Sequence, residues 1–467
     1  MNQFFIPLLT LCLFASPILI PNAISHESLS TRAQNIWTHG HLLGDWGGTR
    51  AQWQDKGFDF ELAYTAEGWA FASGGENQAF LYQGLFEIAL EFDFQKMIGW
   101  SGGSMRVNTL IPHNSDTDSG GPGRYTGSGY DSSNISAYET VRLYELWLQQ
   151  EALDGKLSLR VGQLAADDEF FISDTAGLFL GGTFDWGNNL ASNLPNGGPA
   201  YPVAGLGTRL KIQPMEQFYL MSAVFEGDVG DQAGNNKHGV DFNLDDDGIL
   251  IINEIGFLLN QEENATGLPG SYKLGGWVHT GRFESFRFDE TGLFLDDPAR
   301  DGDGDGEPDS GPGFTRGTWG LYLIADQMVY RPVKDSDQGL SLFWRIAGGP
   351  DKTSTVSLYT DMGAAYKGLI PGRRQDVLGI ALAMQNYSDI FNDRIRDFNG
   401  DPANPTNRLI DTESMIELTY QINLAPWWYV QPTLQYIINP AGELTPPDRE
   451  TRIPNAFAVG VRSGIVF

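Results

Sequence analysis

The chain has 467 residues, with 59 Asp or Glu against 30 Lys or Arg and a formal net charge of −29. Such an acidic chain offers no basic face to phosphates, which argues against a nucleic-acid-binding protein. Aromatic residues at 12% exclude a disordered chain. The 57 glycines, with 12 Trp and 17 Tyr, favour β-structure with many turns. The only cysteine, Cys12, lies in an N-terminal apolar run, so disulfides and thiolate metal sites are not expected.

Residues 1–25 are expected to form an export signal. An apolar run from Phe4 to Ile20 is interrupted by Pro7 and Pro17, so it is too short and too broken for a stable transmembrane helix. The first three residues carry no Lys or Arg, which is atypical of a leader, and a buried N-terminal helix is the alternative.

One short helix is predicted from Thr49 to Lys56. Thr49 and Gln52 have the spacing of a capping box, and Gly57 suits the position that follows a helix. We expect this helix to lie in the periplasm beside the rim of the structure that follows, within a segment at 26–57.

From residue 58 onward, apolar and polar residues alternate almost throughout. Phe58, Phe60 and Leu62, for example, are separated by Asp59 and Glu61. This period of two places one apolar and one polar face on each strand. Segments of roughly ten residues, the length that a tilted strand needs to cross a bilayer, begin near 58, 83, 103, 138, 156, 206, 216, 251, 272, 318, 338, 353, 376, 412, 428 and 456.

The connections between these strands alternate in length. Those after odd-numbered strands are mostly long and polar, such as 112–137 and 165–205, whereas those after even-numbered strands are mostly short; the short link at 349–352 departs from this rule. This layout is typical of an outer-membrane barrel, with its domain at 58–467. A soluble β-sandwich would also alternate, but its dry core could not accept rows of Glu, Asp, Arg and Gln.

The last strand ends in Phe467, with aromatic or aliphatic residues at alternate positions before it. This ending is typical of chains that the barrel-assembly machinery recognises, so we expect that machinery as a partner. Outer-membrane lipid and lipopolysaccharide are expected around the barrel.

The sequence resembles the carbohydrate-selective porin (OprB-like) family. The resemblance covers about 42–467 and rests on stretches such as LLGDWGGTRAQWQDKGFDFELAYTAE at 42–67, RVGQLAADDEFF at 160–171 and GLYLIADQMVYRP at 320–332. Its most specific part is the Gly-Asp-Trp-Gly-Gly-Thr-Arg motif at 44–50. The resemblance implies a sixteen-stranded antiparallel outer-membrane β-barrel through which small sugars diffuse passively.

The alternation of side chains along each strand predicts which residues line the pore wall. Arg, Asp and Glu can form charge-assisted hydrogen bonds with sugar hydroxyls, and Trp or Tyr can stack on a sugar ring. The candidates on the predicted lumen face are Glu67, Trp69, Arg106, Asn108, Arg160, Arg209, Arg345, Glu417 and Arg462. For each residue the alternative is a solvated charge paired across strands.

The link at 165–205 is unusually long for a structureless connection. Acidic and aromatic residues are mixed in it, and apolar side chains suit a loop that packs inside the barrel. We expect it to narrow the channel, with an outward cap as the alternative. Its candidate constriction residues are Asp167, Asp168, Glu169, Asp185 and Trp186.

A calcium site is predicted in the next long loop. Asn243, Asp245, Asp247 and Glu254 have EF-hand-like spacing, but no flanking helices are expected there. The alternative is that these acidic side chains are solvated surface charges that bind no metal. No other cofactor is expected.

We therefore expect an outer-membrane porin for sugars, with a general or ion-preferring porin as the alternative. An enzyme is not expected, because only His279 lies within a predicted strand and no Ser or acid motif accompanies it. The sequence leaves open whether the protein forms a homotrimer.

Overall fold

The computed structural model describes residues 36–116, 121–242, 248–262, 265–295, 297–300, 302, 308–333, 336–398, 412–440 and 453–467. The leader predicted at 1–25, and the first part of the segment predicted at 26–57, lie outside these residues. Among the described helices, none is long and apolar enough to cross a membrane.

Sixteen antiparallel strands form one closed barrel in which each strand pairs with its neighbours in the sequence and β1 closes on β16. The strands are β1 Phe58–Ser73, β2 Phe80–Asp93, β3 Gly103–Asn114, β4 Arg142–Ala152, β5 Leu157–Leu164, β6 Gly205–Met215, β7 Phe218–Glu226, β8 Ile249–Leu259, β9 Gly270–Asp289, β10 Pro312–Tyr330, β11 Gly339–Gly348, β12 Val356–Lys367, β13 Val377–Tyr387, β14 Thr412–Ala425, β15 Trp428–Ile438 and β16 Ala456–Val466. The predicted fold is confirmed.

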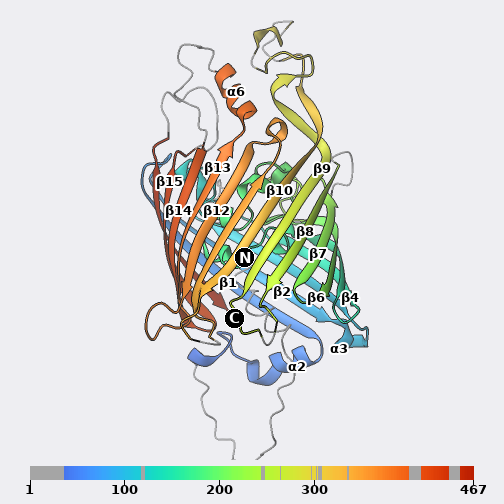
Figure 1. Cartoon of the computed structure of the whole chain (residues 1–467), viewed down its shortest axis with the longest axis vertical. Helices are drawn as coiled ribbons and strands as arrows, with labels where there is room; N and C mark the ends of the chain where they lie inside the picture. Colours follow the sequence, from blue (N-terminus) through green and yellow to red (C-terminus); the bar gives the residue numbers. More distant parts are fainter. Residues whose placement is uncertain are drawn as a thin grey trace, which may run out of the picture.

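The two ends of the barrel differ as the link lengths predicted. Tight links such as 216–217 and 426–427 join strands at one end, called here the turn end, while the long links lie at the opposite loop end. In Figure 1 the turn end carries α2 and α3, and the loop end carries α6 and the projecting tips of β9 and β10. The helices are α2 Thr49–Asp55, α3 Phe94–Ile98, α4 Gly123–Thr126, α5 Asn188–Ala191 and α6 Asp389–Phe398.

The predicted short helix is confirmed, but its cap is not the one expected. Gly48 is the N-cap, with a left-handed φ of 91°, and no side chain caps the helix there. Thr49 is already helical, so the predicted capping box is wrong. Asp45 instead accepts a hydrogen bond from the Ala51 N–H at 3.2 Å, and Gly57 follows the helix with a φ of 88°.

The Gly-Asp-Trp-Gly-Gly-Thr-Arg motif ties the start of the barrel to its end. Buried Arg50 donates to the backbone oxygens of Phe60, at 2.9 Å, and Phe467, at 2.7 Å. Its guanidinium lies 4.6 Å from the centroid of the Trp46 ring. The Leu42 N–H donates to the Val466 oxygen at 2.8 Å, so this segment reinforces the seam between β1 and β16.

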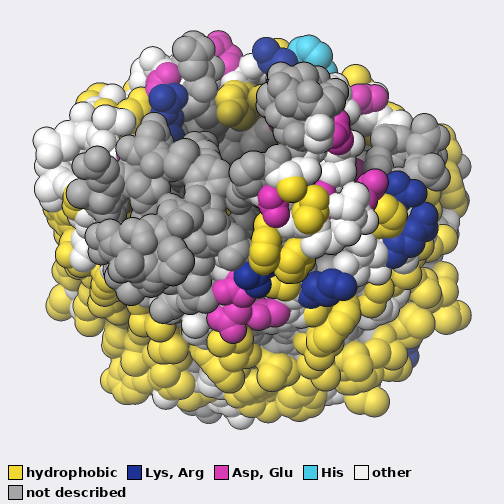
Figure 2. Space-filling model, turned by 90° about the horizontal axis from the view of Figure 1, so that it is seen from above, with side chains coloured by type: hydrophobic (Ala, Val, Ile, Leu, Met, Phe, Trp, Pro, Cys, Tyr) yellow, Lys and Arg dark blue, Asp and Glu magenta, His cyan; other side chains and the backbone are white. Residues whose placement is uncertain are grey.

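The outer and inner surfaces of the barrel have opposite polarity. Exposed apolar side chains such as Leu274, Leu321 and Ile380 cover the outside, and Figure 2 shows this apolar band beyond the loop end. Inside, the loop at 165–204 packs Phe170, Phe179 and other aromatic residues into one cluster with wall residues. This inward path agrees with the apolar side chains that the sequence places in the loop.

Candidate functional site

The predicted wall residues all lie on the inner face, but most of them are covered. Arg160 is partly exposed. The remaining candidates are buried: Glu67, Trp69, Arg106, Asn108, Arg209, Arg345, Glu417 and Arg462. Their burial follows from the loops at 115–141 and 165–204, whose segments bond to the wall. The wall residues therefore fall into loop anchors, a buried charged group around Arg106 on β2, β3 and β4, and the partly exposed Arg160.

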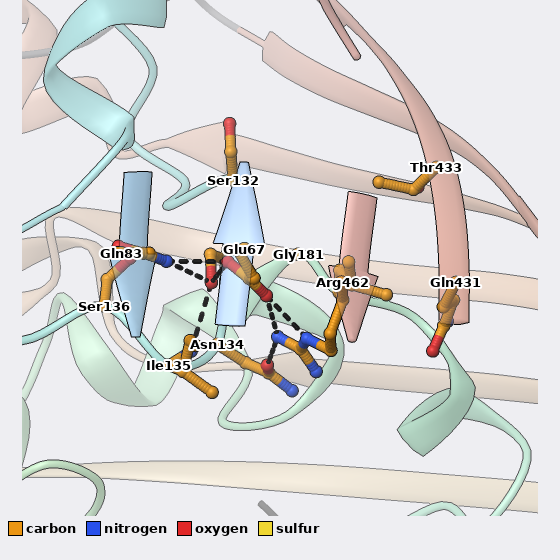
Figure 3. Close-up of polar contacts among 12 residues, drawn as sticks. Glu67, Gln83, Ser132, Asn134, Ile135, Ser136, Gly181, Gln431, Thr433 and Arg462 are labelled. Atoms are coloured by element: carbon orange, nitrogen blue, oxygen red, sulfur yellow. Dashed lines mark hydrogen bonds and ion pairs between the residues drawn. The ribbon is translucent and has the colours of Figure 1, made fainter. Parts of the chain in front are cut away.

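Glu67 anchors the first inner loop at the barrel seam (Figure 3). Its carboxylate accepts hydrogen bonds from the Ser133 hydroxyl at 2.7 Å and the Gln83 amide at 2.7 Å, and it is ion-paired with Arg462. Arg462 also donates to the Asn134 side chain. The Trp69 indole N–H donates to the same carboxylate at 2.8 Å. This cluster joins β1, β2 and β16 to the loop at 115–141.

Glu417 anchors the second inner loop. It accepts the backbone N–H of Leu180 at 2.8 Å and of Gly181 at 2.9 Å. Thr433 and Gln435 of β15 also donate to it, each at 3.0 Å. Both carboxylate oxygens are therefore engaged by the wall and the loop.

Arg345 clamps the same loop from the other side. Its Nε donates to Asp361 of β12 at 3.0 Å, and its guanidinium lies 4.6 Å from the centroid of the Phe171 ring. The remaining donors reach backbone oxygens of Phe171, Thr183, Phe184 and Asp185. A planar fork with five donors is suited to holding several carbonyls at once.

The 165–204 loop meets the wall near its start, at Glu169. Its carboxylate pairs with Arg160 at 2.7 Å and accepts a hydrogen bond from Arg209 at 2.9 Å. The Arg160 guanidinium lies 3.8 Å from the centroid of the Trp147 ring, and its Nε donates to Gln149 at 3.1 Å. Although burial opposes it, the two guanidinium groups lower the pKa of Glu169, which keeps this carboxylate charged.

A second charged group lies on β2, β3 and β4. Arg106 is ion-paired with Glu145 at 3.2 Å and with Glu91. Asn108 donates to Glu87 at 2.8 Å. In this group several carboxylates surround one arginine, whereas at Glu169 two arginines, Arg160 and Arg209, surround one carboxylate.

The other predicted loop residues serve different contacts. Buried Asp167 accepts from the Tyr201 N–H at 2.9 Å, and burial raises its pKa to about 7, assisted by the charge of Asp185. The Trp186 indole donates to the Gly197 oxygen at 3.0 Å. Burial and the Glu145 charge raise the pKa of Asp168. The constriction role of these residues stays a prediction.

Sequence reasoning missed Trp147 and Asp361. Trp147 lies beyond a register shift in which Asn108 pairs with Glu145 but Thr109 pairs with Leu143. The shift inserts one extra residue in β4, which breaks the alternation used to assign side chains to the inner or outer face. Asp361, by contrast, has regular parity opposite Arg345 and could have been found from that pairing.

The predicted calcium ligands are only partly described. Asn243, Asp245 and Asp247 lie outside the described residues. Glu254 belongs to β8, where Tyr219 donates to it at 2.6 Å, Tyr322 at 2.8 Å and the Phe171 N–H at 3.2 Å. The described residues contain no group of three or more His, Cys, Asp or Glu arranged to hold a metal ion.

Comparison with known proteins places this barrel among porins. Residues 77–467 match the family described as carbohydrate-selective porin, OprB family. Porin B of Pseudomonas aeruginosa is 28% identical, over 98% of this chain and 97% of its own. The putative porin QuiX of Acinetobacter baylyi is 25% identical, over 89% of this chain and 92% of its own.

Solved structures agree on the fold. The high-pH structure of Pseudomonas putida OprB has a TM-score of 0.77 at 24% identity, covering 94% of this chain and 100% of that one. The low-pH structure of the same protein has a TM-score of 0.53 at 20% identity, covering 92% and 99%. With the family match extending over most of the sequence, the chain belongs to the carbohydrate-selective porin family and forms a sugar-selective channel of the outer membrane.

Proposed function

We propose that small sugars pass beside Glu169, near the start of the 165–204 loop, and contact Arg160 and Glu169, while buried Arg209 holds Glu169 in place. The observation that supports this most is the partial exposure of the ion pair between Arg160 and Glu169. The Arg160 side chain is 16% exposed and the Glu169 side chain 18%. The anchors Arg345 and Glu417, by comparison, are sealed beneath the loop.

The chemistry of this group suits a passing polyol. A guanidinium and a carboxylate offer donors and acceptors that replace some of the water lost by sugar hydroxyls. The stacking of Arg160 on Trp147 holds the guanidinium in one plane. Contacts of moderate strength favour passage, because a tightly held solute would not leave.

Liposome swelling with a neutral hexose tests this assignment. We expect Arg160→Gln to change the swelling rate severalfold and to weaken the block of ion current by the same sugar. Arg316→Gln is the matched control, because Arg316 is exposed on β10 toward the loop end. Sugar rates and current block equal to those of the unmodified protein would contradict the assignment.

The barrel fold and family are those of a channel, and we propose passive diffusion without covalent chemistry. We also propose recognition of β16 and Phe467 by the barrel-assembly machinery, and lipopolysaccharide around the loop end. A homotrimer stays a proposal that native mass spectrometry can test. Calcium binding by Asn243, Asp245 and Asp247 stays a prediction, to be tested by calorimetry. The fourth predicted ligand, Glu254, instead accepts hydrogen bonds from Tyr219 and Tyr322.

A further inference from the structure

Exposed apolar side chains gather on two short helices at the turn end. Ile98, the last residue of α3, is 72% exposed. Met97 beside it, Trp100 two residues later and Trp53 of α2 are also exposed large apolar side chains. These four residues, called here the rim platform, lie outside the barrel strands.

The two helices form one unit. Lys96 of α3 donates through Nζ to the Gln54 oxygen of α2 at 3.1 Å. The Asp93 N–H donates to the Gly57 oxygen at 2.8 Å. A Cβ on Gly57 would lie 2.9 Å from the Met97 Cγ, so only a glycine allows this close approach. The rim platform is therefore a fixed surface rather than a set of independent side chains.

The rim platform continues the apolar outer wall of the barrel. Trp53 packs edge-on against Phe58, with ring centroids 5.3 Å apart, and Phe58 packs against Phe92 at 5.4 Å. Phe58 and Phe92 are opposite each other on β1 and β2. Phe58 and Phe92 lie on the same outer, lipid-facing side of their strands as Leu62 and Leu90. The positions between them, such as Glu61, face the lumen. A continuous aromatic row thus leads from the lipid-facing wall to α2.

We propose that the rim platform lies in the phospholipid headgroup region of the inner leaflet, so that α2 and α3 are interfacial helices. Trp side chains favour this layer because an apolar ring and a polar N–H are both accommodated there. A short amphipathic helix inserts its apolar side chains about 5–10 Å into the boundary between headgroups and acyl chains. Lys96, half-exposed beside Ile98, can keep its ammonium among the headgroups while its stem covers apolar surface. The helix expected in the periplasm beside the rim is thereby assigned to the membrane surface.

Spin-label accessibility in vesicles of phosphatidylethanolamine and phosphatidylglycerol tests this proposal. The full chain with Cys12→Ser receives a single label at Ile98→Cys. The control is Arg374→Cys, an exposed residue of the 368–376 link at the same end. We expect the ratio of collision with oxygen to collision with a water-soluble nickel chelate to be severalfold higher at 98 than at 374.

Equal ratios at the two positions would overturn the proposal, because the platform would then lie in water. Exclusion of both reagents, or dipolar broadening between labels of two copies, would also overturn it, because protein would then cover the platform. A second label at Met97→Cys guards against a local disturbance at 98. The sugar-swelling rate is independent of these outcomes, so the test separates this proposal from the sugar assignment.

Discussion

Replacing Arg345 with Met is expected to release part of the inner loop and to widen the channel. Arg345 is buried between β11 and the loop, where it holds Asp361 and four loop carbonyls. Methionine retains an apolar stem of similar length but donates no hydrogen bond. The loop segment from Phe171 to Asp185 then loses its clamp.

The free-energy cost of this substitution follows from the contacts that buried Asp361 keeps and loses. Tyr359 would still donate to Asp361 at 2.8 Å, but the carboxylate would lose its buried cation. Removing one partner of a buried ion pair costs about 3–5 kcal/mol. At about 1.4 kcal/mol per tenfold, the ratio of docked to released loop falls about 100- to 4,000-fold. Within the same segment, Glu417 still accepts the Leu180 N–H and Glu254 the Phe171 N–H, so the release is partial. The sixteen-stranded ladder should persist because it is closed by strand pairing, which the clamp does not form.

Single-channel recording and liposome swelling measure the effect. We expect a larger and more variable conductance, and a smaller difference in swelling rate between a monosaccharide and a trisaccharide. Arg345→Lys should give an intermediate result, because lysine keeps the charge but not the planar fork. Arg316→Met, at an exposed position, is the control. A folded Arg345→Met barrel with unchanged conductance and sieving would refute the reasoning.

Two further predictions concern the turn end. Arg50→Met removes two hydrogen bonds at the seam, each worth about 1.5–3 kcal/mol for a charged donor, and should lower the temperature at which the barrel unfolds in SDS; an unchanged temperature would count against the seam role. Although burial opposes it, hydrogen bonds from Arg373, Tyr420 and the Asn423 N–H lower the pKa of Asp376. Its stabilisation is therefore complete above the unfolded pKa of about 4 and is lost as the pH falls below it. Asp376→Asn should flatten the acid dependence of that unfolding temperature, and parallel acid curves would contradict this.

The barrel was predictable because its signal is local. Each strand repeats with a period of two, so the number and order of strands follow from the sequence even where boundaries shift. The largest shift is at β10, which was expected near 318 but begins at Pro312. There the pairing with β9 changes register between Arg316 and Thr318, and Gly317 has a φ of 78°. The bulge interrupts the alternation, so the first part of the strand gives no clear pattern.

The role of the wall residues was less predictable because it depends on a distant segment. Parity places Glu417 and Arg345 inside the barrel, but it cannot show that the loop at 165–204 will cover them. Glu254 illustrates the same limit. Its spacing from Asn243 suggested a calcium loop, whereas its place on the inner face of β8 brings it to Tyr219 and Tyr322. Only the path of the loop distinguishes an anchor from a solute contact.

The covered charges have a physical reason that bears on selectivity. An irregular loop inside a barrel carries backbone groups that neither a ladder nor bulk water satisfies. Carboxylates of the wall accept its N–H groups, as Glu417 does for Leu180, while donors such as Gln431 reach its carbonyls, here Leu178 at 2.7 Å. Burying these side chains costs desolvation that their hydrogen bonds must offset, and each bond matches one backbone position of the loop. The polar wall thus acts as a template for a single loop conformation. Truncating an anchor should therefore disturb sugar sieving before it disturbs the barrel.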